Sequence, residues 1–172
     1  TMINNILDQS PLENIVISWS LNPDTVISHT EWYTPSLDAR LDAAQKCAQR
    51  GYKVGFHLDP VFYYEGWKKD YSAMVAKLFE RIASESIRWI SIGAFRFAPD
   101  LKKIIESRFP SNTILDEELF LSFDGKMRYS LSTRRQIYSF LTDIMRQYSE
   151  KTPLYICMEK ASVWDEFFSR RS

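Results

Sequence analysis

The sequence contains few cysteines and few glycines, and these shortages exclude several kinds of active site. Its two cysteines, Cys47 and Cys157, lie far apart, so they form neither a disulfide framework nor a metal-ligand spacing, and they suit a reducing cytoplasm. The five glycines form no Gly-rich phosphate loop. The motifs Gly-x-Ser-x-Gly, His-x-x-x-His and Cys-x-x-Cys are also absent. The chain therefore shows no self-contained active site of these common enzyme classes.

Neither an excess of charge of one sign nor a long apolar run is present. The 22 basic and 22 acidic residues cancel, so overall charge indicates no nucleic-acid, membrane or acidic partner. Any nucleic-acid site must then be a local patch. No apolar run approaches the roughly 18 residues that span a bilayer, so we expect a soluble, cytoplasmic protein with no membrane partner.

What the sequence does contain is an alternation of strand and helix patterns. With 172 residues, 45% of them hydrophobic, the chain can bury one sizeable core, and we expect a single α/β domain over residues 1–172. Runs at residues 14–20, 53–58 and 87–93 predict strands, and the first is apolar and β-branched at nearly every position, as in a strand buried on both faces. Each precedes a helical pattern, which predicts a parallel sheet wrapped by helices.

The helical patterns differ in strength. The strongest places Tyr71, Met74, Val75, Leu78, Phe79 and Ile82 on one stripe. Residues 24–33 show no regular pattern, and Thr34-Pro35 then predicts the start of a helix that Gly51 ends. Further predicted elements are a helix from Pro99 to Phe109, a long helix over residues 137–148, a strand over 154–158 and a helix from Ser162.

Residues 118–130 predict a β-hairpin. Alternating apolar residues lead to Asp124-Gly125, a pair that tolerates the positive φ angles of a tight turn. The second arm is basic and aromatic through Lys126, Arg128 and Tyr129, which could grip a phosphate backbone while the ring stacks on a base. A solvated basic edge that discourages sheet aggregation explains these residues equally well.

A second candidate site lies where the strand at residues 53–58 runs into an aromatic loop. Ligand sites of α/β proteins gather at the carboxyl ends of strands. His57 and Asp59 lie two apart on one face and near Glu65, a pattern that could form an acid/base or metal cluster. In the alternative, His57 is hydrogen-bonded in the sheet interior and the loop aromatics cap the sheet.

Several short stretches, in matching order and spacing, resemble a known family. They are Ser20-Leu21-Asn22, Thr34-Pro35-Ser36-Leu37-Asp38, Arg50-Gly51-Tyr52, Gly55-Phe56 and Glu65-Gly66-Trp67. Together they resemble the C-terminal half of the spore photoproduct lyase family of radical S-adenosylmethionine enzymes. Residues 56–67 and 124–129 are more similar to non-spore members, whose substrates need not be spore DNA lesions.

The resemblance implies an α/β fold that forms a partial βα barrel of parallel strands, half of a radical S-adenosylmethionine barrel, with a C-terminal hairpin and helices. It implies that a [4Fe-4S] cluster cleaves S-adenosylmethionine to a radical that attacks a thymine-dimer lesion in DNA, with the hairpin wedged at the damage. Residues carried over by position are Ser20, Asn22 and Asp59 for the cofactor, and Lys126, Arg128, Tyr129, Tyr63 and Tyr64 for the substrate.

Two departures from the family pattern qualify the resemblance. The spore enzymes carry a small apolar residue where this chain has Asp59, and the cluster-binding Cys-x-x-x-Cys-x-x-Cys motif is missing. The resemblance thus implies no catalytic residue and no metal ligand in this chain. Either the chain is the C-terminal part of a longer enzyme whose N-terminal half is its partner, or it is a stand-alone, non-catalytic α/β binding or interaction module. For the isolated chain, we expect no iron binding and self-association through an exposed sheet edge beside residues 15–20.

Overall fold

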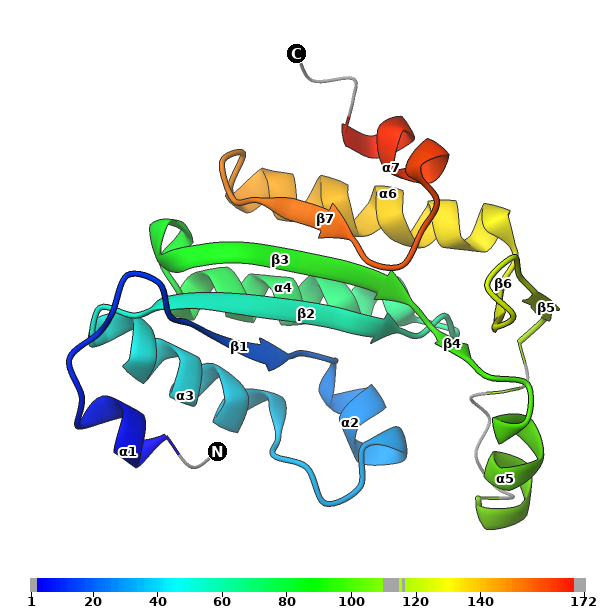
Figure 1. The fold of residues 1–172 in the computed structure, drawn as a ribbon, viewed down its shortest axis with the longest axis horizontal. Coiled ribbons are helices and arrows are strands. Elements are labelled where there is room, and N and C mark those ends of the chain that lie inside the picture. The colour runs from blue at the N-terminus through cyan, green and yellow to red at the C-terminus, as the bar shows by residue number, and fades with distance from the viewer. Residues whose placement is uncertain (1–2, 110–114, 116, 169–172) are drawn as a thin grey trace.

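The central feature of the computed structural model, which describes residues 3–109, 115 and 117–168, is a parallel four-stranded sheet (Figure 1). The other residues of the predicted 1–172 domain lie outside this description. The strand order is β1-β2-β3-β7, and every neighbouring pair is parallel. The strands are β1 Val16–Ser20, β2 Lys53–Val61, β3 Ile87–Ala94 and β7 Leu154–Ile156. The predicted parallel α/β architecture is therefore confirmed.

Helices follow the strands, as the alternation predicted. They are α1 Asn4–Leu7, α2 Asp24–Thr30, α3 Leu37–Gln49, α4 Trp67–Arg81, a 3-10 turn Ser84–Ser86, α5 Leu101–Arg108, α6 Leu131–Tyr148 and α7 Ala161–Phe168. Helix α4 packs between α3 and α6 in one layer against the sheet. The stripe that predicted α4 explains this position, because Tyr71, Met74, Val75 and Leu78 are all buried.

The two faces of the sheet have different chemistry. On β2, the side chains of Val54, Phe56 and Leu58 are fully buried in the apolar core. The alternate residues of β2 are Gly55, His57 and Asp59, and the register places Ser20 and Ser91 beside His57. One face is thus apolar and covered by helices, while the other, which we call the polar face, carries small and polar residues with the Trp89 ring lying over Gly55.

A small antiparallel sheet stands at the carboxyl end of β3 (Figure 1). Its strands are β4 Arg96–Phe97, β5 Leu119–Leu121 and β6 Met127–Tyr129, in the order β4-β6-β5. The predicted hairpin is confirmed, and Gly125 in its turn has the expected positive φ of 74°. Strand β4 was not predicted, because a two-residue strand carries no periodicity.

Four local predictions were wrong. Residues 24–30 form helix α2, whose start has no capping side chain in the sequence to signal it. Helix α3 begins after Ser36, whose hydroxyl accepts the Ala39 N–H at 3.2 Å, and not at Thr34. Strand β2 runs on to Val61 through a cis Asp59-Pro60 bond. Strand β1 is not buried on both faces, because it lies at the edge of the sheet.

Candidate functional site

The carboxyl ends of β2, β3 and β7 meet at an ion pair on the polar face. Arg96 donates from Nη1 to Asp59 Oδ1 at 2.7 Å and from Nη2 to Asp59 Oδ2 at 2.9 Å. Nη1 also reaches the carbonyl of Ala94 at 3.2 Å, and Nη2 lies 3.9 Å from the Cys157 Sγ. Both carboxylate oxygens of Asp59 are therefore taken by one guanidinium, which also contacts the residue that follows β7.

A glycine makes room for this pair. A Cβ built on Gly93 of β3 would lie 2.7 Å from the Asp59 Cγ, closer than real Cβ atoms approach other atoms. The Asp59 carboxylate thus rests directly on the backbone of the neighbouring strand, where only glycine leaves space for it.

The ion pair fixes the protonation of its members. Burial alone would raise the pKa of Asp59, but the hydrogen bonds and charge of Arg96 more than offset this and hold that pKa below its usual value. Burial, followed by the hydrogen bond and negative charge of Asp59, raises the pKa of the Cys157 thiol. Asp59 is therefore a stable anion at neutral pH and Cys157 stays a protonated thiol.

His57 lies on the same face with a partner of its own. Its Nδ1 is 2.7 Å from the Ser91 Oγ on β3, which matches the alternative of a hydrogen-bonded histidine in the sheet. Glu65 is exposed in the turn before α4. Within the described residues, no group of three or more His, Cys, Asp or Glu side chains is placed to hold a metal ion.

The three predicted cofactor residues lie at adjacent strand ends but differ in availability. Ser20 is exposed at the end of β1, and its carbonyl accepts the Arg40 Nη1–H at 2.9 Å. Asn22 is 1% exposed, donates to Glu31 Oε1 at 2.8 Å and accepts from the Tyr71 hydroxyl at 2.9 Å. Among the three, Ser20 alone presents its side chain to solvent without a described side-chain partner.

The predicted substrate tyrosines bind other parts of the protein. The Tyr64 hydroxyl donates to Asp70 at 2.9 Å, and burial followed by this carboxylate raises its pKa. The Tyr129 hydroxyl accepts the backbone N–H of Tyr63 at 3.2 Å, and burial raises the pKa of Tyr129 to about 12. The bond between Tyr63 and Tyr129 ties the hairpin to the loop after β2, so the two predicted substrate segments do lie together.

Arg128 is the centre of a buried network at the base of the hairpin. It is 2% exposed, pairs with Asp124 and donates to the carbonyl of Met158 at 3.0 Å. Its Nη1 also lies 3.7 Å from the Glu159 carboxylate, whose side chain is 1% exposed. Arg134 and the Tyr138 hydroxyl, the latter at 2.8 Å, converge on the same carboxylate. A solvated basic arm is therefore wrong for Arg128 and Tyr129, whereas Lys126 is only partly buried.

The outer side of the hairpin is apolar and aromatic. Phe120, Leu121 and Phe123 are 47%, 68% and 59% exposed. Lys160 places its Nζ 4.5 Å from the centre of the Phe123 ring, within the range of a cation–π contact. The hairpin thus combines a buried ionic base with an exposed apolar tip, a composition typical of interaction surfaces.

Comparison with known proteins identifies the family. The family model described as spore photoproduct lyase matches residues 1–152. This chain belongs to the spore photoproduct lyase family. The Clostridium acetobutylicum spore photoproduct lyase is 29% identical over an alignment of 158 residues that covers 88% of this chain and 47% of that protein. The Bacillus subtilis (strain 168) spore photoproduct lyase is 32% identical over 119 residues, covering 67% of this chain and 35% of that protein.

Solved structures of this family share the fold. A spore photoproduct lyase mutant with bound AdoMet and dinucleoside spore photoproduct superposes with a TM-score of 0.77 at 25% identity, covering 89% of this chain and 47% of that one. A mutant with dinucleoside spore photoproduct gives a TM-score of 0.78 at 26% identity, covering 90% and 48%. The chain spans about half the length of the first of these curated relatives and of both solved chains.

The residues of this spore photoproduct lyase family member do not provide a site for an iron–sulfur cluster. Such a cluster is held by several cysteine thiolates. Cys47 is fully buried within α3, Cys157 is beside Asp59, and the pKa of each thiol is raised, first by burial.

No helix in the described part of the chain is both long and apolar enough to cross a membrane.

Sequence reasoning missed the residues that complete the site in this family member. Arg96, Gly93, Cys157 and Glu159 are on separate segments and show no shared motif. One available signal is position, because Gly93 and Arg96 lie at the carboxyl end of β3, next to that of β2 where Asp59 was singled out.

Proposed function

We propose that this chain is the C-terminal portion of a radical S-adenosylmethionine enzyme of the spore photoproduct lyase family. Its part is to bind the cofactor and a thymine-dimer lesion in DNA for reductive radical repair. Support comes from family membership and from a related structure that contains AdoMet and dinucleoside spore photoproduct. The observation that carries the proposal is the polar face, where Ser20, Asp59 and Arg96 gather at neighbouring strand ends.

Bound S-adenosylmethionine, together with a cluster held by residues outside this chain, would supply the radical chemistry. The residues of this chain bind and orient. We propose that the exposed Ser20 hydroxyl contacts the cofactor, that Asn22 shapes the strand end through Glu31 and Tyr71, and that Asp59 acts by fixing Arg96.

On the substrate side, we propose that the hairpin meets the damaged DNA. Lys126 provides a cation for a phosphate, and the exposed ring of Phe123 provides an apolar surface for a base. The contacts of Arg128 and Tyr129 with the rest of the protein hold the hairpin in position. Tyr63 and Tyr64 belong to the loop after β2 that contacts the hairpin.

The binding half of this proposal can be tested on the chain itself. A fluorescein-labelled oligonucleotide that contains a thymine dimer should bind more tightly than its undamaged counterpart in an anisotropy titration. Lys126→Ala should weaken binding and reduce the salt slope by about one, because one phosphate contact is lost. The matched control is Lys151→Ala, an exposed lysine before β7 at the opposite end of the strands. Equal affinity for damaged and undamaged DNA, with no effect of Lys126→Ala, would contradict the proposal.

The chemical half requires the upstream coding sequence. If that sequence encodes three cysteines in the Cys-x-x-x-Cys-x-x-Cys spacing, the longer protein should gain iron on anaerobic reconstitution and cleave S-adenosylmethionine. If the reconstituted protein gains no iron and leaves the cofactor intact, the enzyme proposal fails. The second candidate, a stand-alone binding module, is favoured by the two distant cysteines, and it would stand if the upstream sequence encodes no cysteines in that spacing within the same reading frame.

A further inference from the structure

The loop between α2 and α3 presents two aromatic rings to solvent. Trp32 is 57% exposed and Tyr33 is fully exposed. Tyr33 also has a φ of 63°, a left-handed conformation that residues with a side chain adopt rarely. Tyr33 is the third residue of a β-turn that the Thr34 N–H closes onto the Glu31 carbonyl at 3.3 Å, and a type II turn requires a positive φ at that position. Glycine or asparagine is usual there, whereas tyrosine places a large ring in water at some cost in backbone strain.

The loop that carries these rings is rigid. Arg40 of α3 is 6% exposed and donates to the Pro35 carbonyl at 3.0 Å, to the Thr34 hydroxyl at 2.9 Å and to the Glu31 carboxylate. Thr34 also returns to the Glu31 carbonyl through its hydroxyl at 2.8 Å. A buried guanidinium thus connects the Glu31 and Thr34 side chains and the Pro35 carbonyl, which flank Trp32 and Tyr33, so that little loop entropy remains to be lost when a ligand binds the rings.

Helix α5 continues this surface with apolar and basic side chains. Trp32 contacts Phe109, at the end of α5, edge to face with 5.1 Å between ring centres. None of the eight residues of α5 is buried, and Leu101 and Ile104 are 43% and 45% exposed. The charged residues on and directly before this helix are Lys102, Lys103, Arg108, Asp100 and Glu106, of which Glu106 lies 3.9 Å from Lys102. The helix therefore adds cations beside the rings, one of them partly neutralised.

We propose that Trp32, Tyr33 and the basic residues of α5 form a stacking platform for an unpaired stretch of DNA. Exposed aromatic rings stack on bases of any sequence, and neighbouring lysine and arginine side chains follow the phosphates. Helix α5 and the β5–β6 hairpin lie on the side of the molecule where β2 and β3 end (Figure 1), and the Trp32–Phe109 contact joins the α2–α3 loop to the end of α5. The choice of DNA as the ligand rests on the proposed function, but the platform is separate from the hairpin site.

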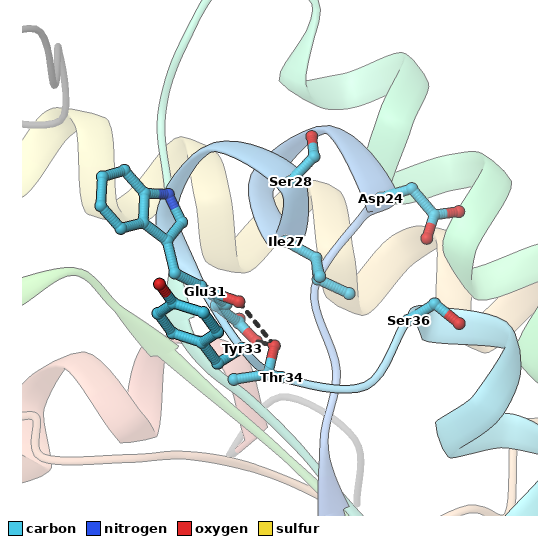
Figure 2. Close-up of a pocket in the computed structure, with 8 residues that line it drawn as sticks. Asp24, Ile27, Ser28, Glu31, Tyr33, Thr34 and Ser36 are labelled. Atoms are coloured by element: carbon cyan, nitrogen blue, oxygen red, sulfur yellow. Dashed lines mark hydrogen bonds between the residues drawn. The ribbon is translucent and has the colours of Figure 1, made fainter.

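The surroundings of the loop leave the Tyr33 ring accessible. A hollow of about 490 Å³ adjoins the loop, lined by residues 24, 27, 28, 31–34 and 36. Figure 2 shows Tyr33 and Thr34 on one side of this hollow and Asp24 and Ser36 on the other. The Asp24 carboxylate makes the hollow itself unsuitable for a phosphate. We therefore place bases on the rings and phosphates on the α5 side.

The test is the affinity of the chain for an undamaged, single-stranded oligo(dT) labelled with fluorescein, measured by anisotropy over a range of salt concentrations. The variants are Trp32→Ala, Tyr33→Gly, which keeps the positive φ without strain, and the double variant. The double variant should bind about tenfold more weakly or worse with an unchanged salt slope, because stacking is lost and phosphate contacts are kept. Lys102→Ala with Lys103→Ala should instead reduce the salt slope by about one to two.

The control is Tyr148→Ala, which removes a ring that is 49% exposed at the far end of α6, and it should leave affinity unchanged. Circular dichroism melts of all variants check that the fold is retained. If the folded double variant binds oligo(dT) like the parent, the platform is wrong. The chain has five tryptophans, so the Trp32 signal is the part of the fluorescence that Trp32→Ala removes. The platform is also wrong if this signal responds to a second copy of the chain or to the upstream half and not to DNA.

Damaged DNA separates this inference from the proposed function. If the chain prefers the thymine-dimer oligonucleotide and depends on Lys126 but not on Trp32 and Tyr33, the hairpin proposal stands and the platform falls. If undamaged oligo(dT) binds through the two rings without any preference for damage, the platform stands and the lesion proposal falls.

Discussion

Substitution of Glu159 tests whether the hairpin is held by its buried charge network. Glu159→Gln removes the negative charge on which Arg134 and Tyr138 converge, and which lies 3.7 Å from Arg128. The side chains of Arg128 and Arg134 are only 2% and 11% exposed, so their charges would stay buried with less compensation. Removing one member of a buried pair costs about 3–5 kcal/mol.

The lower end of that range applies here. Arg128 keeps its pair with Asp124 and its bond to the Met158 carbonyl, so Arg134 bears most of the loss. The amide of glutamine can still accept one hydrogen bond. We therefore expect Glu159→Gln to lower the free energy of unfolding by about 3 kcal/mol.

Urea unfolding followed by circular dichroism measures this change. The matched control is Glu166→Gln, which breaks a pair with Arg135 whose side chains are 36% and 49% exposed, and it should cost at most about 1 kcal/mol. Proteolysis at low enzyme concentration should cut the hairpin faster in Glu159→Gln than in the control. If the two variants lose equal stability, or if proteolysis of the hairpin is unchanged, the network does not hold the hairpin.

Three further predictions concern the sheet. Gly93→Ala should lower the free energy of unfolding by about 1–3 kcal/mol in urea titrations, because its Cβ would displace the Asp59 carboxylate; an unchanged midpoint would refute this. Arg96 holds the folded-state pKa of Asp59 below the unfolded value of about 3.9, so the ion pair stabilises the fold fully above that value. This stabilisation is lost as pH falls through the lower folded-state pKa. The difference in unfolding free energy between the parent and Asp59→Asn should therefore be constant above about pH 5 and shrink in acid. We predict that the isolated chain self-associates through the edge strand β1. Ile15, directly before β1, is 41% exposed, so Ile15→Lys should reduce this association in light scattering; a monomeric parent chain would contradict the prediction.

Local patterns were sufficient for the elements whose stabilising contacts lie on one stripe or in one turn. The spacing from Tyr71 to Leu78 determines α4 whatever it packs against, and Asp124-Gly125 determines the hairpin turn. Helix α2 lacks such a signal, because tertiary contacts of Val26 and Ile27 hold it and no capping side chain does. Patterns of period and capping therefore predicted the fold class but not every element.

The site was harder to predict because its bonds connect distant segments. Asp59 and Arg96 are 37 positions apart and meet only after β2 and β3 pair. The charge of Arg128 suggested a ligand-facing residue, yet carboxylates from its own turn and from the segment after β7 surround it. The sequence does not reveal which carboxylate will pair with a given arginine or lysine. Whether such a side chain faces solvent or a buried acid therefore depends on the folded topology.

The geometry also changes what Asp59 can do. Each of its carboxylate oxygens accepts one N–H of Arg96, and Gly93 leaves no further space behind it. An acid with both oxygens engaged is a poor direct ligand for a cofactor hydroxyl or amine, but it fixes a guanidinium beside the polar face. Any effect of Asp59→Asn on ligand binding should therefore be reproduced by Arg96→Met, and the double variant should add little, because the two residues act as one unit.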